Sequence, residues 1–262
     1  HRQGGTDARK KDRQRLMNLA FITTAIILGG LIKGLNGFGY ALVSTSLLTL
    51  FMPAQEAVAL MIIPLIIANI ELTTKLSMEE LKACLTRFRA YIAASFIGVT
   101  LGMILIEYMP ALLLKKAVGL LVLVFVASRT RKISKIFTTA KEFCVENQRV
   151  EPLLGLLSGL IFGSSNVGVP FVAYFKELQL SREKFVSMIA ITVLGASLLR
   201  IGLAASLGLY TGTDAVLISA ALGVPGLIAV KTGDKLGEKL SEKITEKASL
   251  LLLLAIGLRL VL

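Results

Sequence analysis

Eight stretches of this 262-residue chain are apolar over lengths that cross or enter a lipid bilayer. A helix needs about 20 apolar residues to span the hydrocarbon core, and a soluble domain has no use for a series of such runs. Lipid also excludes open sheet edges and irregular backbone. We therefore expect an all-α polytopic membrane protein. Its segments are expected near 17–51, 56–74, 89–107, 110–128, 152–175, 185–207, 214–231 and 246–262.

A glycine-rich motif occurs twice in the chain, at positions 129 residues apart. The first copy, 30–39, is Gly-Leu-Ile-Lys-Gly-Leu-Asn-Gly-Phe-Gly. The second, 159–168, is Gly-Leu-Ile-Phe-Gly-Ser-Ser-Asn-Val-Gly, and Pro170 follows it. Glycine and proline interrupt helices, and bare backbone at membrane depth is tolerated where it lines a cavity or is buried in protein. Two matched interruptions therefore indicate a transport site between two internal repeats.

The duplication extends beyond the glycine motif, because Gly102 and Lys116 recur 131 residues later as Gly233 and Lys247. We expect two four-segment repeats, and the first segment of each repeat is the glycine-broken one. The chain then divides into a basic N-terminal tail, a first transmembrane repeat, a basic cytoplasmic connector and a second transmembrane repeat. Their bounds are 1–16, 17–128, 129–151 and 152–262.

Lysine and arginine gather in some connectors and avoid others. Of the 29 Lys and Arg residues, 18 lie within 72–90, 128–151, 176–184 and 231–247, whereas 51–57, 106–111 and 207–214 contain none. Cytoplasmic loops carry an excess of these residues, so we place the first group of connectors in the cytoplasm.

Two of the basic connectors, 128–151 and 231–247, are expected to form amphipathic surface helices. In the second, Lys235, Lys239 and Lys243 recur every four residues. This spacing is typical of a solvated, ion-paired helix face.

Equivalent connectors of the two halves differ in charge, since 106–111 lacks Lys and Arg while its counterpart 231–247 is rich in lysine. We therefore expect the repeats to be inverted. Inversion needs an odd number of crossings in each half, which four segments provide when the first segment enters and returns as a re-entrant hairpin. This scheme places the tail over 1–16 outside, against its six Lys and Arg residues. An extra crossing within 17–51 would remove the conflict.

The chain lacks the residues that several classes of function require. The net charge of +12 is explained by cytoplasmic loops, and without interleaved aromatic residues we expect no nucleic-acid partner. With His1 as the one histidine, no zinc site or histidine base is expected, and the chain has neither a GxSxG elbow nor a Walker A motif. Cys84 and Cys144 are not in a CxxC pair. We expect no enzyme, no cofactor and no metal site.

Two cations lie inside apolar segments, Lys33 in the first glycine motif and Arg200 near the middle of 185–207. A charge within a membrane segment is costly and usually serves function. The functional interpretation is an electropositive pocket for a small anion. The alternative is snorkelling, or pairing with Glu71, Glu107 or a backbone carbonyl.

The helix interruptions also supply hydrogen-bond donors. A broken helix leaves backbone N–H groups unpaired, and a helix N-terminus favours an anion. The alternative is that glycine and serine there only permit close helix packing. Together with the two cations, the candidate substrate-binding residues are Asn36, Gly37, Gly39, Asn69, Ser164, Ser165, Asn166 and Gly168.

The ordered pair Gly-Leu-Asn-Gly-Phe-Gly and Gly-Ser-Ser-Asn-Val-Gly-Val-Pro resembles the sulfite exporter TauE/SafE family of secondary transporters, and so does the lysine-rich run at 233–237. The resemblance covers residues 20–262. It implies transport of small sulfur-containing or organic anions such as sulfite, sulfonates or sulfoacetate, coupled to a proton or ion gradient.

We therefore expect a multi-pass protein of the cell membrane that exports such an anion by alternating access. Its expected partners are the anion, membrane lipids and a coupling proton or ion, and a homodimer is left open. Two alternatives remain at this stage. A cation or metal transporter would need buried carboxylates or Met, His and Cys clusters, and a non-transporting membrane scaffold subunit would need no site at all.

Overall fold

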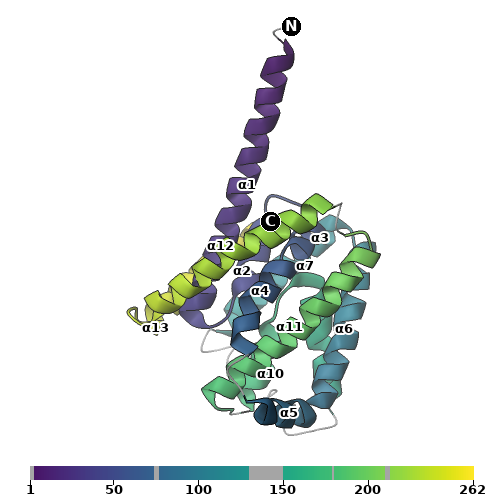
Figure 1. The fold of residues 1–262 in the computed structure, drawn as a ribbon, viewed down its shortest axis with the longest axis vertical. Helices are drawn as coiled ribbons and strands as arrows, with labels where there is room; N and C mark the ends of the chain where they lie inside the picture. Colours follow the sequence, from purple (N-terminus) through teal and green to yellow (C-terminus); the bar gives the residue numbers. More distant parts are fainter. Residues whose placement is uncertain (1–2, 74–76, 130–149, 179, 210–212) are drawn as a thin grey trace.

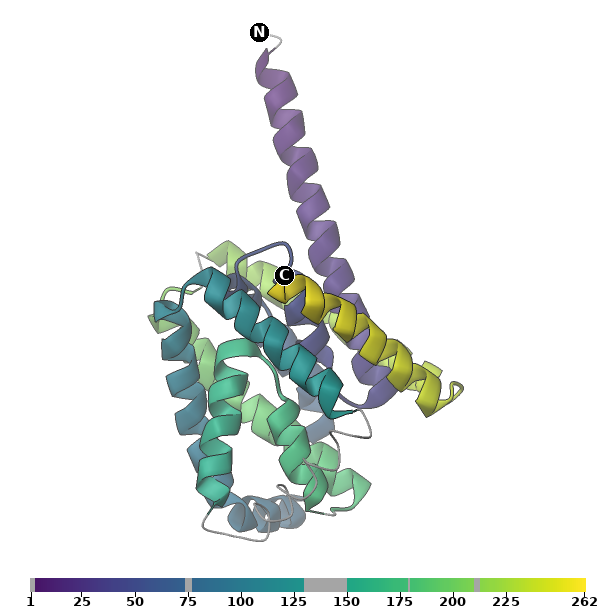
Figure 2. The ribbon, with the colours of Figure 1, turned by 180° about the vertical axis from the view of Figure 1, so that it is seen from behind.

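The fold is given by a computed structural model, which describes residues 3–73, 77–129, 150–178, 180–209 and 213–262. Every regular element in these ranges is a helix, so the all-α prediction is confirmed. The helices pack into a bundle from which the N-terminal part of the first one projects (Figures 1 and 2). The helices are α1 (Gln3–Asn36), α2 (Tyr40–Leu48), α3 (Ala54–Leu60), α4 (Ile62–Thr73), α5 (Met78–Arg87), α6 (Arg89–Tyr108), α7 (Ala111–Ser128), α9 (Glu151–Ser165), α10 (Val169–Glu177), α11 (Arg182–Ser206), α12 (Thr213–Gly237) and α13 (Glu242–Val261).

Five helical stretches in the described ranges are long and apolar enough to cross a membrane. The polytopic prediction is therefore supported by element length as well as by composition. A shorter apolar stretch, Ala54–Ile70, runs through α3 and α4. The five are Leu19–Asn36, Arg89–Tyr108, Ala111–Ser128, Lys184–Ser206 and Val216–Gly237.

The first glycine motif ends α1 and reverses the chain. Gly37 and Gly39 have φ angles of 79° and 101°, which glycine adopts without steric cost. After this break α2 returns along α1, where the Ser44 hydroxyl donates a hydrogen bond of 3.0 Å to the carbonyl of Ala25. The two helices therefore form an antiparallel hairpin around the motif.

The second glycine motif produces a similar reversal. Asn166 ends α9 with a φ of 61°, and Pro170 lies in the first turn of α10, as its missing N–H predicts. The Tyr174 hydroxyl of α10 donates to Glu151 at the start of α9, with an O···O distance of 2.5 Å. Closer to the break than this pair, the rings of Phe162 and Phe171 are also in contact. Hence α10 returns along α9.

The first segment of each half packs along the third segment of the other half, so that α1 lies along α12 and α9 lies along α6. A Cβ atom built on Gly34 of α1 would lie 2.2 Å from the Val230 carbonyl oxygen of α12. One built on Gly159 of α9 would lie 1.9 Å from the Ser95 carbonyl oxygen of α6. No side chain fits at these distances, so backbone meets backbone in both pairs. This matches the small-residue contacts that hold membrane helices together.

The last helices of the two halves, α7 and α13, pair with each other in opposite directions. Gly119 of α7 lies against Leu260 near the end of α13, while Arg129 after α7 forms an ion pair of 3.5 Å with Glu246 at its start. Antiparallel pairing of equivalent helices is the packing that inverted repeats produce. The pairing gives the relative direction of α7 and α13 but not the side of a membrane that each end faces, so the inversion stays a prediction.

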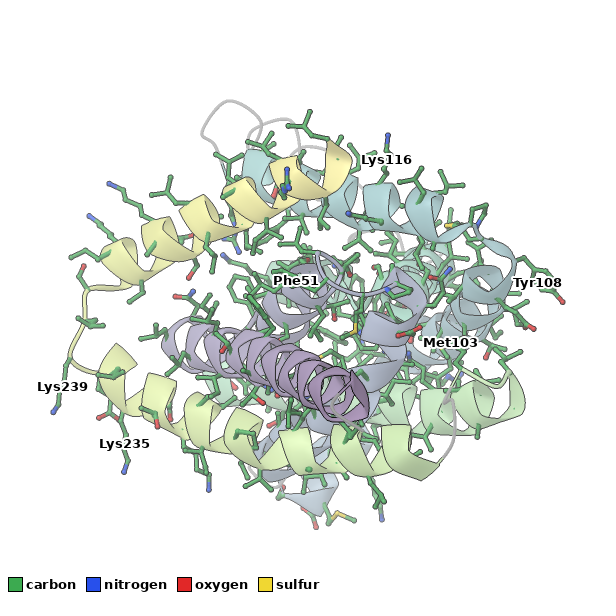
Figure 3. All side chains as sticks on the ribbon, turned by 90° about the horizontal axis from the view of Figure 1, so that it is seen from above. Phe51, Met103, Tyr108, Lys116, Lys235 and Lys239 are labelled. Atoms are coloured by element: carbon green, nitrogen blue, oxygen red, sulfur yellow. The ribbon has the colours of Figure 1, made fainter. Side chains whose placement is uncertain are left out.

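The predicted surface helix within 231–247 is wrong. Lys235 belongs to α12, which continues to Gly237, and Lys243 belongs to α13, so the lysines do not share one helix. Figure 3 shows Lys235 and Lys239 directed away from the bundle around this turn. Most of the other predicted surface helix, in 128–151, lies outside the described residues.

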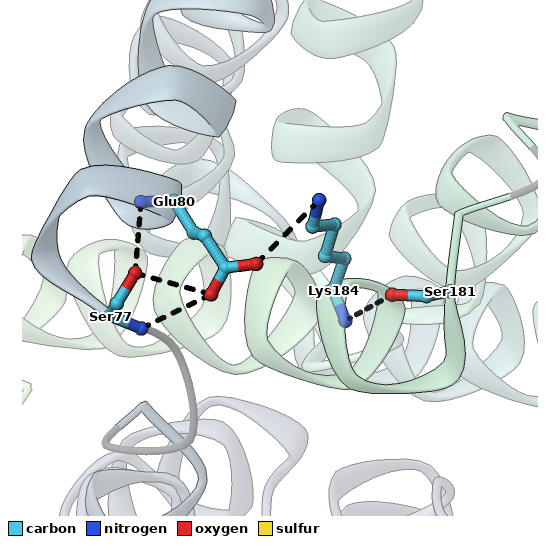
Figure 4. Close-up of polar contacts among 4 residues, drawn as sticks. All are labelled: Ser77, Glu80, Ser181 and Lys184. Carbon is cyan, nitrogen blue, oxygen red and sulfur yellow. Dashed lines mark hydrogen bonds and ion pairs between the residues drawn. The ribbon is translucent and has the colours of Figure 1, made fainter.

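An amphipathic helix that we did not predict, α5, lies across one end of the bundle (Figure 1). Ser77 and Glu80 form a capping box at its start, in which the Ser77 hydroxyl accepts from the Glu80 N–H at 3.2 Å. Glu80 also lies 3.7 Å from Lys184 of α11, whose first turn is capped by Ser181 (Figure 4). The capping box therefore ties α5 to α11.

Candidate functional site

The two glycine motifs meet at one cavity of about 1030 Å³. Its walls come from the end of α1, the start of α2, α4, the second motif, α10, α11 and the turn between α12 and α13. Seven of the ten residues predicted for substrate binding line it. They are Lys33, Asn36, Gly37, Gly39, Asn69, Asn166 and Gly168.

Lys33 places a buried positive charge at the wall of this cavity. Its side chain is 7% exposed, and its ammonium donates to the Ala68 carbonyl at 3.1 Å and to Asn69 Oδ1 at 2.9 Å. Asn69 is held in place because its Nδ2 donates to the Leu65 carbonyl of the same helix at 2.7 Å. Lys33 is thus fixed by neutral oxygen atoms of α4, as the backbone-carbonyl alternative predicts, and it also faces the cavity.

Asn36 lies beside Lys33 at the end of α1. Its Nδ2 donates to the Ser249 hydroxyl of α13 at 2.7 Å. Its Oδ1 is buried and has no hydrogen-bond partner among the described residues. A buried acceptor left without a partner is costly, so this amide is a candidate for binding water or a protonated substrate group.

Two helix N-termini face the same space. The cavity is lined by Tyr40, Ala41 and Leu42 at the start of α2 and by Val169 at the start of α10. Neither Gly39 nor Gly168, the residues that precede these helices, offers a side-chain cap. The first-turn N–H groups of α2, and those of Val169 and Phe171 in α10, where Pro170 has none, receive no cap from these glycines, and their partial positive charge favours an anion.

Arg200 lies behind the second motif and does not line the cavity. It is fully buried, and its guanidinium donates to Asn166 Oδ1 and lies over the Phe162 ring, 5.2 Å from the centroid. It also approaches the Val58 carbonyl and Met103 Sδ at 3.5 and 3.4 Å. Arg200 itself does not line the cavity, but two residues that it contacts, Asn166 and Phe162, do.

Asn166 connects Arg200 to the first half of the chain. Its Nδ2 donates to the Thr45 hydroxyl of α2 and to the Val58 carbonyl of α3, both at 3.0 Å. It is the one non-glycine residue with a positive φ in the described ranges. Asparagine tolerates that conformation better than most residues, so its side chain can hold the left-handed turn while linking α2, α3 and α11.

Ser164 and Ser165 lie in the predicted motif but do not line the cavity. The Ser164 hydroxyl donates to the Leu160 carbonyl at 2.8 Å, and the Ser165 hydroxyl donates to the Ile161 carbonyl at 2.6 Å. Ser165 also accepts from the N–H of Val167. Both hydroxyls are therefore occupied by their own helix end.

The sequence model of the sulfite exporter TauE/SafE family matches residues 22–260, nearly the whole chain. The chain belongs to this family. TauE/SafE proteins are membrane transporters rather than enzymes, so the transmembrane and transport predictions are confirmed at that level. No curated protein and no solved structure matches the chain. The roles of the individual site residues stay predictions.

Some cavity residues of this TauE/SafE protein were missed by sequence reasoning. Tyr40 directly follows the first glycine motif, lines the cavity, and has a buried hydroxyl with no hydrogen-bond partner in the described ranges. Its place after the motif was the available signal. Phe38 also lines the cavity, and Arg129 lies over its ring at 5.5 Å. A contact across 91 positions of sequence has no local signal.

Charged side chains gather where the cavity of the TauE/SafE protein opens. Lys176, Asp234 and Glu238 are exposed, and Arg129 pairs with Glu246 beside them. The described residues contain no group of three or more His, Cys, Asp or Glu side chains that could hold a metal ion.

Proposed function

We propose that this protein is a secondary transporter that exports a small sulfur-containing or organic anion across the cell membrane by alternating access. Sulfite, sulfonates and sulfoacetate are the expected substrate types. The observation that carries the proposal is the buried ammonium of Lys33, which faces the same cavity as two helix N-termini. Positive charge and free N–H groups around one water-accessible space suit an oxyanion.

The distribution of charge supports a cavity open to the cytoplasm. Its charged lining residues in the described ranges, Arg129, Lys176, Asp234, Glu238 and Glu246, belong to connectors that the positive-inside rule places inside. The opposite side, next to the connectors without Lys or Arg, is closed by an apolar cluster. Its buried members are Ala54, Val58, Ile62, Met103, Ile106, Leu114 and Ala204.

The layer around Arg200 and Asn166 separates the cavity from this apolar cluster. Val58 and Met103 belong to the cluster, and Arg200 contacts both of them as well as Asn166. We assign Arg200 a positioning role, in which it holds the second glycine motif at the cavity floor. Alternating access would require this layer to part and the cytoplasmic opening to close, so that the anion leaves on the other side.

Flux in proteoliposomes tests the proposal. Vesicles loaded with labelled sulfite should release it faster than protein-free vesicles do, and an excess of sulfoacetate or a simple sulfonate should slow that release. Lys33→Gln should lower the rate at least about tenfold, because the buried ammonium supplies much of the attraction. Ser164→Ala, outside the cavity lining, is the matched control and should transport normally. Release of divalent metal ions and of none of these anions would overturn the proposal.

A further inference from the structure

Lys33 is a buried cation without a carboxylate partner in the described part of the chain. The ion pairs found there join Arg87 to Glu151, Arg129 to Glu246 and Lys184 to Glu80. Lys33 instead donates to two neutral oxygen atoms, those of Ala68 and Asn69. It lies within the membrane-spanning stretch Leu19–Asn36. Among the described residues, its positive charge therefore has no carboxylate counter-charge.

The other charged side chains among the described lining residues are exposed or paired with each other. Lys176 comes from α10, Asp234 and Glu238 come from α12, and Arg129 and Glu246 neutralise each other. The remaining titratable neighbour is the buried phenol of Tyr40, from α2. On α4, Glu71 follows Asn69 by two positions, and its side chain lies outside the described part of the structure.

The Lys33 ammonium becomes unfavourable in any state in which the cavity is closed on both sides. Closure removes the water that solvates the ammonium through the cavity, and a lone ammonium in a closed, membrane-embedded site is costly. Two states avoid that cost. In one, the ammonium is paired with a bound anion. In the other, the side chain is a neutral amine and the site is empty.

We propose that Lys33 carries the proton that is coupled to anion transport. This inference rests on the proposed anion transport and adds the coupling step. The ammonium binds the anion, and the neutral pair passes through the closed state. On the far side the anion leaves, the Nζ–H bond breaks, the proton goes to water and the electron pair stays on Nζ. The empty amine returns and takes a proton from water on the loading side. One proton thus moves with each anion, in the same direction.

A singly charged anion would then be carried without net charge. The wild-type measurement uses hydrogen sulfite, the main species of sulfite in mildly acidic medium, in vesicles with equal pH on both sides. A potassium gradient with valinomycin sets the membrane potential, and protein-free vesicles give the leak to subtract. We expect the protein-dependent efflux to be unchanged when the sign of the potential is reversed. An efflux that follows the potential would mean that the anion moves alone, and would overturn the inference.

The Lys33→Arg variant separates binding from proton release, because a guanidinium stays charged. Exchange of labelled for unlabelled sulfite needs no empty return, and it should remain within about threefold of wild type. Net efflux needs the neutral empty state, and it should fall at least about tenfold. Lys116→Arg, whose side chain points outward in Figure 3, should alter neither. Net efflux in Lys33→Arg that equals wild type and ignores the potential would contradict the proposal.

The Glu71→Gln variant tests whether Glu71, two positions after Asn69, carries the proton instead of Lys33. Under the proposal this variant keeps an efflux that ignores the potential. Efflux that becomes potential-dependent in Glu71→Gln, with wild-type behaviour in Lys33→Arg, would assign the proton to Glu71 and overturn the role of Lys33. Failure of the transport proposal is a different result. In that case the wild-type protein neither exchanges nor releases sulfite.

Discussion

Arg200 shows how a fully buried guanidinium is kept within a membrane protein. A charge at the bilayer centre costs about 3 kcal/mol by insertion measurements. The cost is offset by hydrogen bonds to Asn166 and to the Val58 carbonyl, and by the face of Phe162. The same contacts fix Asn166 in a left-handed conformation at the cavity wall. One cation therefore stabilises the turn that shapes the cavity.

Removal of the Asn166 amide should destabilise this layer. Asn166→Ala takes an acceptor from Arg200, takes a donor from Thr45 and places alanine at a φ of 61°. We expect a loss of about 1–3 kcal/mol, since a buried, charged guanidinium loses one of its acceptors. Thermal unfolding in detergent should show a clearly lower Tm. Ser164→Ala removes only a bond within its own helix, and an equal loss of stability in that variant would contradict the explanation.

Arg200 should affect the rate of transport more than the affinity for the anion. Because Arg200 does not line the cavity and contacts the lining residues Asn166 and Phe162, Arg200→Lys should lower the maximal rate of sulfite efflux and leave the half-saturating concentration within about twofold of wild type. Initial rates over a range of sulfite concentrations measure both quantities. A large rise in half-saturation at unchanged maximal rate would mean that Arg200 touches the anion.

The sequence predicted the cavity residues better than it predicted their roles. The backbone breaks at Gly37, Gly39 and Asn166 follow from local conformational preference, so sequence could locate them. Lys33 and Arg200 look alike in sequence, as single cations in apolar runs. Only the packing of α11 behind α9 distinguishes them, and that packing depends on contacts distant in the chain. The serines were misleading because a hydroxyl can bond to its own helix.

At the scale of elements, glycines determine how closely α6 approaches α9. Gly159→Ala would drive a methyl group into the Ser95 carbonyl, whereas a Cβ on Gly202 of α11 meets nothing within 4 Å. We expect Gly159→Ala to cost about 1–3 kcal/mol by overpacking. Gly202→Ala should be neutral or stabilising, by up to about 1 kcal/mol, through helix propensity. Thermal unfolding of the two variants side by side checks this, and equal Tm values would argue against the close contact.

The helix positions followed from sequence where apolar length and glycine breaks determined them, as in α6, α7 and the ends of α1 and α9. The structure of the connectors did not follow from the sequence in this way. The lysine spacing across 235–243 suggested one helix, but a turn after Gly237 separates α12 from α13. Periodicity cannot reveal such a turn when the residues on both sides are good helix formers. The start of α5 carried a readable signal in the Ser77 and Glu80 capping box, which we did not use.

At the scale of the whole molecule, the reciprocal packing of the two halves supports inverted repeats. Inversion predicts that Pro110 and Leu240 face opposite sides of the membrane, and both are exposed to reagent. Single cysteines at these positions, in a background without Cys84 and Cys144, should react with an impermeant thiol reagent from opposite sides of oriented vesicles. Labelling of both from the same side would exclude the inverted arrangement.

The most direct test asks whether the anion passes through the cavity between the two glycine motifs. Val172→Cys lies in the cavity wall, and Leu120→Cys lies on the outer face of α7, where Leu120 is 59% exposed. Sulfite efflux is measured in proteoliposomes before and after complete modification of each cysteine by a bulky thiol reagent. We predict that efflux stops after modification at position 172 and continues after modification at position 120. Efflux that persists with position 172 fully modified, or an unmodified protein that moves no sulfite or sulfonate, would contradict transport through this cavity.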